Sequence, residues 1–231
     1  DLVAEGRGGP QKIPRPEQWH TGSPAPWIDQ KQKVISLETI ENAISRYSPP
    51  PSTEEIKTRR RSAVLIPIYA HSSDELHVIL TRRSAMMKHH THEVSFPGGN
   101  KEPEDADLWA TAVREAQEEI GLDLMLPRQI GTLDSFVTVG SNSYITPFVG
   151  ILDAIPELQA NPIEVEEIIH VPLCELLDPK IYREEIWELR DGSRRPVYFF
   201  ELVDNTVWGA TASILRQFLT IVLSIENKNP S

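Results

Sequence analysis

The sequence predicts an α/β fold, in which buried strands alternate with amphipathic helices. Apolar residues run without interruption through 63–70 and predominate in 76–80, which is typical of short strands covered on both faces. The segments 107–120 and 210–225 instead repeat their apolar residues at helical spacing. The length of 231 residues fits one domain, alone or with extensions.

The first part of the chain is rich in proline, glycine and glutamine. Prolines at positions 10, 14, 16, 24 and 26 exclude a regular helix there. We therefore expect residues 1–34 to form an extended or disordered arm and residues 35–231 to form the domain. Trp19 and Trp27 indicate that the arm docks, either on its own domain or on a second subunit.

The domain begins with a helix that is expected over 37–47, after Ser36 and before the prolines at 49–51. Gly121 closes the helix at 107–120. Further apolar runs predict strands at 130–139, 145–152 and 168–171, the last leading into a helical turn near Cys174. A hairpin is expected over 185–201, with Asp191 and Gly192 at its tip, and the helix at 210–225 follows.

Composition excludes several classes of protein. The net charge of −11 argues against a general nucleic-acid binder. No apolar run is long enough to predict a membrane span, and the N-terminus lacks the apolar core of a signal peptide. Cys174 is the one cysteine, which excludes an intrachain disulfide and suits a cytoplasmic location. Because it lies among apolar residues, we expect a small buried side chain rather than a nucleophile.

Three glutamates on the helix at 107–120 are the principal chemical signal. Glu115, Glu118 and Glu119 are spaced i, i+3 and i+4, so they lie within about 100° of arc. Carboxylates this close repel one another unless a cation neutralises them, and such hard oxygen ligands suit Mg²⁺ or Mn²⁺. Taken alone, three glutamates on a helix are most often a solvated face, with Arg114 and Glu118 as a helical ion pair. The preceding Phe96-Pro97-Gly98-Gly99 favours a metal site, because glycine allows the backbone to approach closely.

The stretch from Gly99 to Leu122 resembles the Nudix box. That pattern is Gly, five residues, Glu, seven residues, and then Arg-Glu-aliphatic-any-Glu-Glu-any-Gly-aliphatic. Residues 114–122 match its second half, with Ala116 at the aliphatic position. In the first half Asp105 follows Gly99 after five intervening residues, where the pattern has Glu. Eight residues, rather than seven, then separate Asp105 from Arg114. Glu104 is a competing candidate for the same acidic position.

The resemblance implies an α/β/α sandwich around a mixed sheet and hydrolysis of a diphosphate. It implies that Glu115, Glu118 and Glu119 bind Mg²⁺ or Mn²⁺ near Gly99. Arg114 would orient the glutamates by ion pairing. Nudix enzymes often use a further glutamate from outside the box as base or metal ligand; by position we expect Glu164, with Glu167 as the next candidate and a solvated acidic loop as the alternative.

The segment before the box resembles the motif of coenzyme A pyrophosphatases within the Nudix family. That motif reads Leu-Leu-Thr-any-Arg-Ser, three residues, Arg, three residues, Gly, three residues, Phe-Pro-Gly-Gly. Lys88 replaces the motif's second arginine, and His92 replaces its glycine, which would be strained if the position requires φ > 0. The residues that match it are Leu80, Thr81, Arg83, Ser84, Phe96, Pro97, Gly98 and Gly99.

The expected substrate contacts are cationic or imidazole side chains: Arg83, Lys88, Arg82 and His92. Arg82 and Arg83 point to opposite faces of a strand, so at most one of them faces the site. The charge run at residues 59–61 is expected to be solvated. A zinc site built from His89, His90 and His92 is disfavoured, because no cysteine lies nearby and the His-Glu-any-any-His spacing is absent.

The expected reaction is therefore hydrolysis of coenzyme A or acyl-coenzyme A to 3′,5′-ADP and 4′-phosphopantetheine or its acyl form. One alternative is a Nudix hydrolase for another nucleoside diphosphate derivative, such as ADP-ribose, NADH or a nucleoside triphosphate. A second is a non-catalytic Nudix-fold nucleotide sensor. The resemblance also makes a homodimer reasonable.

Overall fold

A mixed β-sheet forms the centre of the protein. The computed structural model describes residues 6–30, 35–51, 59–72, 75–86, 92–138 and 143–224. Strand β2 (Arg60–Ser72) runs parallel to β8 (Ser143–Leu152) and antiparallel to β3 (Glu75–Arg83). The other strands of this sheet pair with those three: β4 (Val94–Ser95) and β9 (Val165–Pro172) with β3, β5 (Gly98–Asn100) with β2, and β6 (Pro127–Thr132) and β7 (Phe136–Val137) with β8.

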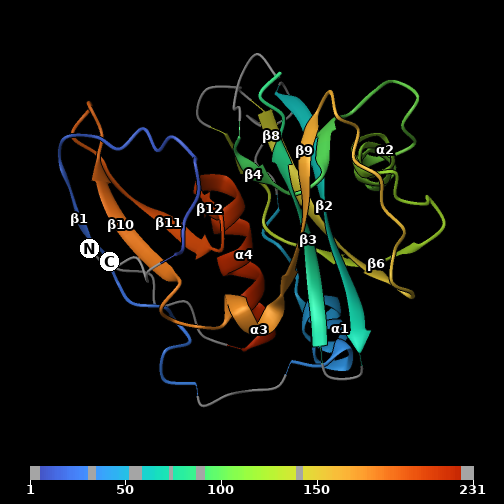
Figure 1. The fold of residues 1–231 in the computed structure, drawn as a ribbon, viewed down its shortest axis with the longest axis horizontal. Coiled ribbons are helices and arrows are strands. Elements are labelled where there is room, and N and C mark those ends of the chain that lie inside the picture. Colours follow the sequence, from blue (N-terminus) through green and yellow to red (C-terminus); the bar gives the residue numbers. More distant parts are fainter. Residues whose placement is uncertain are drawn as a thin grey trace.

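Helices cover both faces of this sheet (Figure 1). On one face α2 (Leu108–Ile120) packs its buried stripe against β2. On the other face α4 (Gly209–Val222) and α1 (Leu37–Arg46) share the larger apolar core. The predicted α/β fold with a mixed sheet is confirmed, and the apolar periodicity of each helix explains which face it buries.

A smaller, four-stranded sheet stands beside α4 (Figure 1). Its strands are antiparallel: β1 (Trp19–Thr21), β10 (Tyr182–Glu188), β11 (Arg194–Leu202) and β12 (Asn205–Trp208). The β10–β11 hairpin was predicted, and Gly192 at its tip has a φ of 79°. The sequence pattern did not predict that the hairpin would gain a third and a fourth strand.

Two local predictions were wrong. The strand expected over 130–139 is divided into β6 and β7, which pair with successive parts of β8, and residues 133–135 between them belong to neither strand. Cys174 is exposed rather than buried. It lies on α3 (Leu173–Leu176), a single turn whose buried positions are Leu173 and Leu176, so the residue after Leu173 points outward.

The described part of the N-terminal arm lies against the small sheet. Strand β1 pairs with β10, and the Arg7 guanidinium bonds to Glu175 at 2.6 Å. Trp27 is buried and stacks on Phe200. The division into an arm and a domain stays a prediction, but residues 7–27 contact the rest of this chain. None of the described helices has the length and apolar character to cross a membrane.

Candidate active site on the glutamate helix

Helix α2 presents the three glutamates at three different depths. Asp107 caps its N-terminus by accepting a hydrogen bond from the Ala110 N–H at 2.8 Å, and Gly121 ends it in the left-handed conformation. The apolar stripe fixes the rotation of the helix against the sheet. As a result the exposed fraction of the side chain is 4% for Glu119, 15% for Glu115 and 52% for Glu118.

Glu119 is a buried carboxylate with few compensating partners. Burial raises its pKa to about 8, although Arg83 and the Gly98 N–H both oppose this shift. The Gly98 N–H donates to Oε2 at 3.2 Å, and Nη1 of Arg83 lies 3.9 Å from Oε1. Glu115 and Glu164 add negative potential that raises the pKa further. A cation beside Glu119 would offset this cost.

Gly98 and Gly99 leave no room for a side chain, but for different reasons. A Cβ on Gly98 would lie 2.6 Å from the backbone Cα of Val64. A Cβ on Gly99 would lie 2.5 Å from both carboxylate oxygens of Glu115. The first contact would disturb β2 itself, whereas the second would displace one flexible carboxylate.

We expect Gly99→Ala to lower turnover about 10²-fold with little loss of thermal stability, because Glu115 can swing aside but no longer occupies its position. Gly98→Ala is the matched comparison and should lower the melting temperature. Steady-state rates and thermal melts of both variants test this. A Gly99→Ala enzyme with full turnover would remove Glu115 from the reaction.

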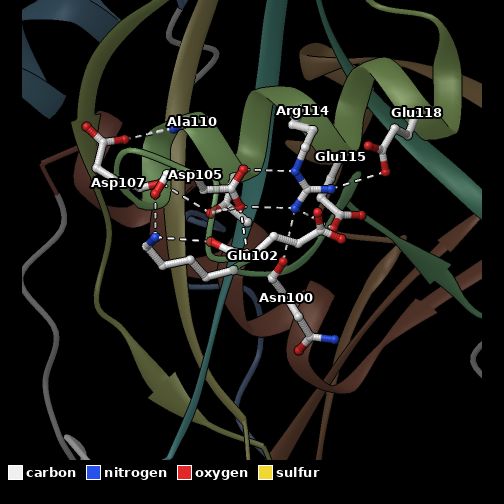
Figure 2. Close-up of polar contacts among 10 residues, drawn as sticks. Asn100, Glu102, Asp105, Asp107, Ala110, Arg114, Glu115 and Glu118 are labelled. Carbon is white, nitrogen blue, oxygen red and sulfur yellow. Dashed lines mark hydrogen bonds and ion pairs between the residues drawn. The ribbon is translucent and has the colours of Figure 1, made fainter.

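Arg114 is held between the glutamates and a buried aspartate (Figure 2). Its Nε donates to Asp105 Oδ1 at 2.9 Å, and its Nη2 donates to Asp105 Oδ2 at 3.1 Å. Its Nη1 bonds to Glu118 at 3.1 Å, and its Nη2 lies 3.1 Å from Glu115. Asp105 is buried and also accepts from the Thr111 hydroxyl at 2.8 Å, whereas Glu104 is exposed. Asp105 therefore occupies the place of the first acidic residue of the box.

The two arginines of β3 diverge, as the strand alternation predicts. Arg83 faces Glu119 and α2. The Arg82 guanidinium reaches the opposite side, where it pairs with Glu167 at 2.8 Å and bonds to Asn205 at 3.1 Å. This placement argues against the predicted contact between Arg82 and the diphosphate.

His92 has a φ of 62°, in the left-handed region. Its ring Nδ1 lies 2.9 Å from Glu166, and its N–H donates to the Arg83 carbonyl at 3.0 Å. The conformation is one that glycine adopts without strain and that costs other residues about 1–2 kcal/mol. Lys88, His89 and His90 lie outside the described residues.

The two candidate bases differ in their surroundings. Glu164 interacts electrostatically with both Glu115 and Glu119, and it raises the pKa of each. Its carbonyl accepts from the Ser84 N–H at 2.8 Å, which fixes the loop next to β3. The Glu167 carboxylate instead forms an ion pair with the Arg82 guanidinium at 2.8 Å. The geometry favours Glu164 of the two.

The carboxylate oxygens of the three glutamates suit a hard divalent cation, but the three side chains do not point toward a common position. In the described part of the chain, no three acidic, histidine or cysteine side chains come close enough together to hold a metal ion. Arg114 instead holds Glu115 and Glu118. The buried Glu119, the raised pKa of Glu115 and the absence of a Cβ at Gly99 all fit a cation at this place.

A separate cavity of about 1510 Å³ lies between the two sheets and the start of α4. Ser95 on β4 is one of its lining residues, but none of the described predicted site residues lines it. The carboxylates with raised pKa values, Glu115 and Glu119, lie on α2 and not in this cavity. We therefore expect the chemistry to take place at the glutamates.

This chain is similar to known proteins of one family. The family described as the NUDIX domain matches residues 59–190 of this chain. A protein from Photorhabdus laumondii named "Uncharacterized Nudix hydrolase NudL" is 36% identical over 80% of this chain and 96% of its own length. The chain belongs to the Nudix family.

A second relative belongs to the same family. "Nudix hydrolase 22, chloroplastic" from Arabidopsis thaliana is 34% identical over 84% of this chain and 67% of its own length. The crystal structure of a Nudix hydrolase from Alicyclobacillus acidocaldarius has 19% identity and a TM-score of 0.49, covering 74% of this chain and 98% of that one. The relatives from Photorhabdus laumondii and Arabidopsis thaliana are both named as Nudix hydrolases, which supports a Nudix hydrolase activity for this chain.

Sequence reasoning left two features of this Nudix site open or unseen. The choice between Glu104 and Asp105 could not be made by counting, and it is decided by the buried contact with Arg114. Gln11 and Asn205, which surround His92 and Arg82, were not predicted at all. Both are far from the box in the chain, and no local pattern marks them.

Proposed function

We propose that this Nudix hydrolase cleaves the diphosphate of coenzyme A or acyl-coenzyme A, giving 3′,5′-ADP and 4′-phosphopantetheine or its acyl form. The observation that carries the proposal is the backbone at His92. The coenzyme A motif has glycine there, and His92 keeps the left-handed conformation that glycine favours. The backbone conformation at position 92 is thus compatible with the motif despite the substitution.

Glu115, Glu118 and Glu119 would bind Mg²⁺ or Mn²⁺, once Glu115 and Glu118 turn from Arg114 toward Glu119. A divalent cation there supplies positive charge that offsets the phosphate oxygens and makes water a better nucleophile. Arg83, whose guanidinium already lies near Glu119, would contact the same phosphates. Arg114 would keep the glutamates oriented, because Asp105 fixes its guanidinium.

Glu164 would accept the proton of the attacking water. We expect Glu164→Gln to lower turnover about 10²–10⁴-fold with little change in folding, because its side chain is only partly buried and the amide cannot take a proton. Steady-state kinetics and thermal melts measure both effects. Glu167→Gln is the control and should retain turnover; the reverse ranking would exchange the two roles.

The substrate is tested by a panel with Mg²⁺ or Mn²⁺: coenzyme A, its acyl forms, NADH, ADP-ribose and nucleoside triphosphates, with products identified by mass. Release of 3′,5′-ADP from coenzyme A is the expected result. Cleavage of another compound without 3′,5′-ADP from coenzyme A would replace the substrate. No product from any member would favour a nucleotide sensor.

A cytoplasmic homodimer is the expected form of the enzyme, and light scattering measures its mass.

A further inference from the structure

The loop that carries the substrate motif joins β3 to β4, and contacts fix both of its described ends. At one end the Ser84 N–H donates to the Glu164 carbonyl at 2.8 Å. At the other end His92 bonds through its N–H to Arg83 and through its ring to Glu166. The position of His92 therefore sets where the motif segment returns to the sheet.

The remaining polar group of the His92 backbone is bound by the N-terminal segment. Gln11 is buried, and its Nε2 donates to the His92 carbonyl at 2.9 Å and to Asn205 Oδ1 at 3.3 Å. Its Oε1 accepts from the Thr206 N–H at 2.8 Å. The orientation of the amide is fixed by these contacts, because a flipped amide would set its oxygen against the His92 carbonyl and its NH₂ against the Thr206 N–H.

Asn205 connects Gln11 to Arg82 on β3. Its Oδ1 also accepts from Arg82, whose guanidinium pairs with Glu167 and lies 3.4 Å from Glu166. Glu166 in turn binds the His92 ring. Gln11, Asn205, Arg82, Glu166 and His92 thus form a closed polar ring, with Gln11 as its only member from the N-terminal segment.

Gln11 is held in place independently of His92. The Gly9 N–H donates to the Thr206 hydroxyl at 3.2 Å, and the Gly8 N–H donates to the Leu202 carbonyl at 2.8 Å. Arg7 adds the ion pair with Glu175. The segment is therefore attached to β11 and β12 by contacts that do not touch the motif loop.

We propose that Gln11 is a positioning residue for substrate binding, which acts through the His92 carbonyl on His92 and, through the hydrogen bond from the His92 N–H, on Arg83. This inference rests on the proposed function, because it takes His92 and Arg83 as substrate contacts. It makes Gln11 part of the working active site, whereas Arg7 only attaches the segment to Glu175. It also gives a reason for an amide at position 11, since one end must donate to His92 while the other accepts from Thr206.

Gln11→Met tests the proposal, because methionine keeps the volume but loses both sets of hydrogen bonds. Arg7→Met is the matched control: it loosens the same segment at the Glu175 ion pair and leaves His92 untouched. The first readout is amide hydrogen exchange at His92 and Arg83 in the full chain. We expect exchange at His92 to become at least tenfold faster in Gln11→Met and to stay unchanged in Arg7→Met.

The second readout is kinetic. With whichever compound the wild-type enzyme cleaves, KM should rise about tenfold in Gln11→Met, while kcat changes less than threefold. Equal effects of both variants, on exchange or on KM, would mean that Gln11 only attaches the segment and would overturn the proposal. Unchanged exchange at His92 in Gln11→Met would also overturn it. Failure of the coenzyme A proposal is read separately, from the products of the wild-type enzyme alone.

Discussion

Glu119→Gln is expected to lower turnover about 10²–10³-fold with either Mg²⁺ or Mn²⁺. Glu119 is the most deeply buried of the three glutamates. Its carboxylate accepts a hydrogen bond from the Gly98 N–H and lies 3.9 Å from the Arg83 guanidinium. An amide keeps the shape of the side chain but cannot offset the charge of a divalent cation. Steady-state kinetics over a range of metal concentrations measure the effect, and near-normal turnover would remove Glu119 from the metal site.

The same substitution is expected to increase stability when no metal is present. The pKa of Glu119 is raised by burial from 4.5 to about 8, so between these values the folded state holds a proton that the unfolded state has released. Folding stability contributed by this group therefore falls as the pH rises from 4.5 to about 8. Glutamine does not titrate and avoids this loss.

Denaturant unfolding at pH 5 and pH 8 in the presence of a chelator tests the prediction. Glu119→Gln should exceed the wild type in stability at pH 8 by about 1–4 kcal/mol, and the difference should shrink toward pH 5. Added Mg²⁺ should stabilise the wild type more than the variant. Glu118→Gln is the control, because that side chain is exposed, and it should not exceed the wild type in stability at pH 8. A Glu119→Gln protein that is less stable at pH 8 would contradict this account.

Asp105→Asn should have the largest effect on stability, a loss of about 3–5 kcal/mol. Asp105 and Arg114 share two hydrogen bonds in a largely buried place, and the asparagine leaves the guanidinium without its main counter-charge. Arg114 would then be drawn toward Glu115 and Glu118. We therefore also expect turnover to fall about 10–100-fold, the size typical of residues that orient metal ligands.

The pH dependence of this loss has the opposite sign to that of Glu119. The Arg114 guanidinium holds the pKa of Asp105 well below its ordinary 3.8. The stability that this carboxylate contributes is therefore complete above pH 3.8 and is lost as the pH falls below it. Denaturant unfolding of wild type and Asp105→Asn at pH 7 and pH 3 measures the difference, which should be smaller at pH 3. Glu104→Gln is the control, because that side chain is exposed. An equal loss of stability in Glu104→Gln would mean that Glu104, and not Asp105, is the acidic residue that stabilises Arg114.

Local features of the fold could be predicted because neighbouring residues determine them. Ser36 and Asp107 cap α1 and α2 where the sequence predicts a helix start, and Gly121 ends α2. The i, i+3, i+4 spacing of Glu115, Glu118 and Glu119 is enough to place them on one side of α2. The alternation of a strand likewise separated Arg82 from Arg83.

Features that depend on residues far apart in the chain could not be predicted in this way. The exposure of Cys174 depends on which side of a single helical turn meets the core, and composition alone suggested the opposite. The split between β6 and β7 depends on how two segments share β8. Neither has a signal within its own few residues.

The sequence by itself indicated the reaction class, because the resemblance of residues 99–122 to the Nudix box is a local pattern. The tertiary structure alone decided how deeply each glutamate is buried, that Asp105 holds Arg114, and that Gln11 reaches His92 across 81 residues. Burial and long-range hydrogen bonds depend on what packs opposite a residue. That partner is set by the whole fold and not by the adjacent chain.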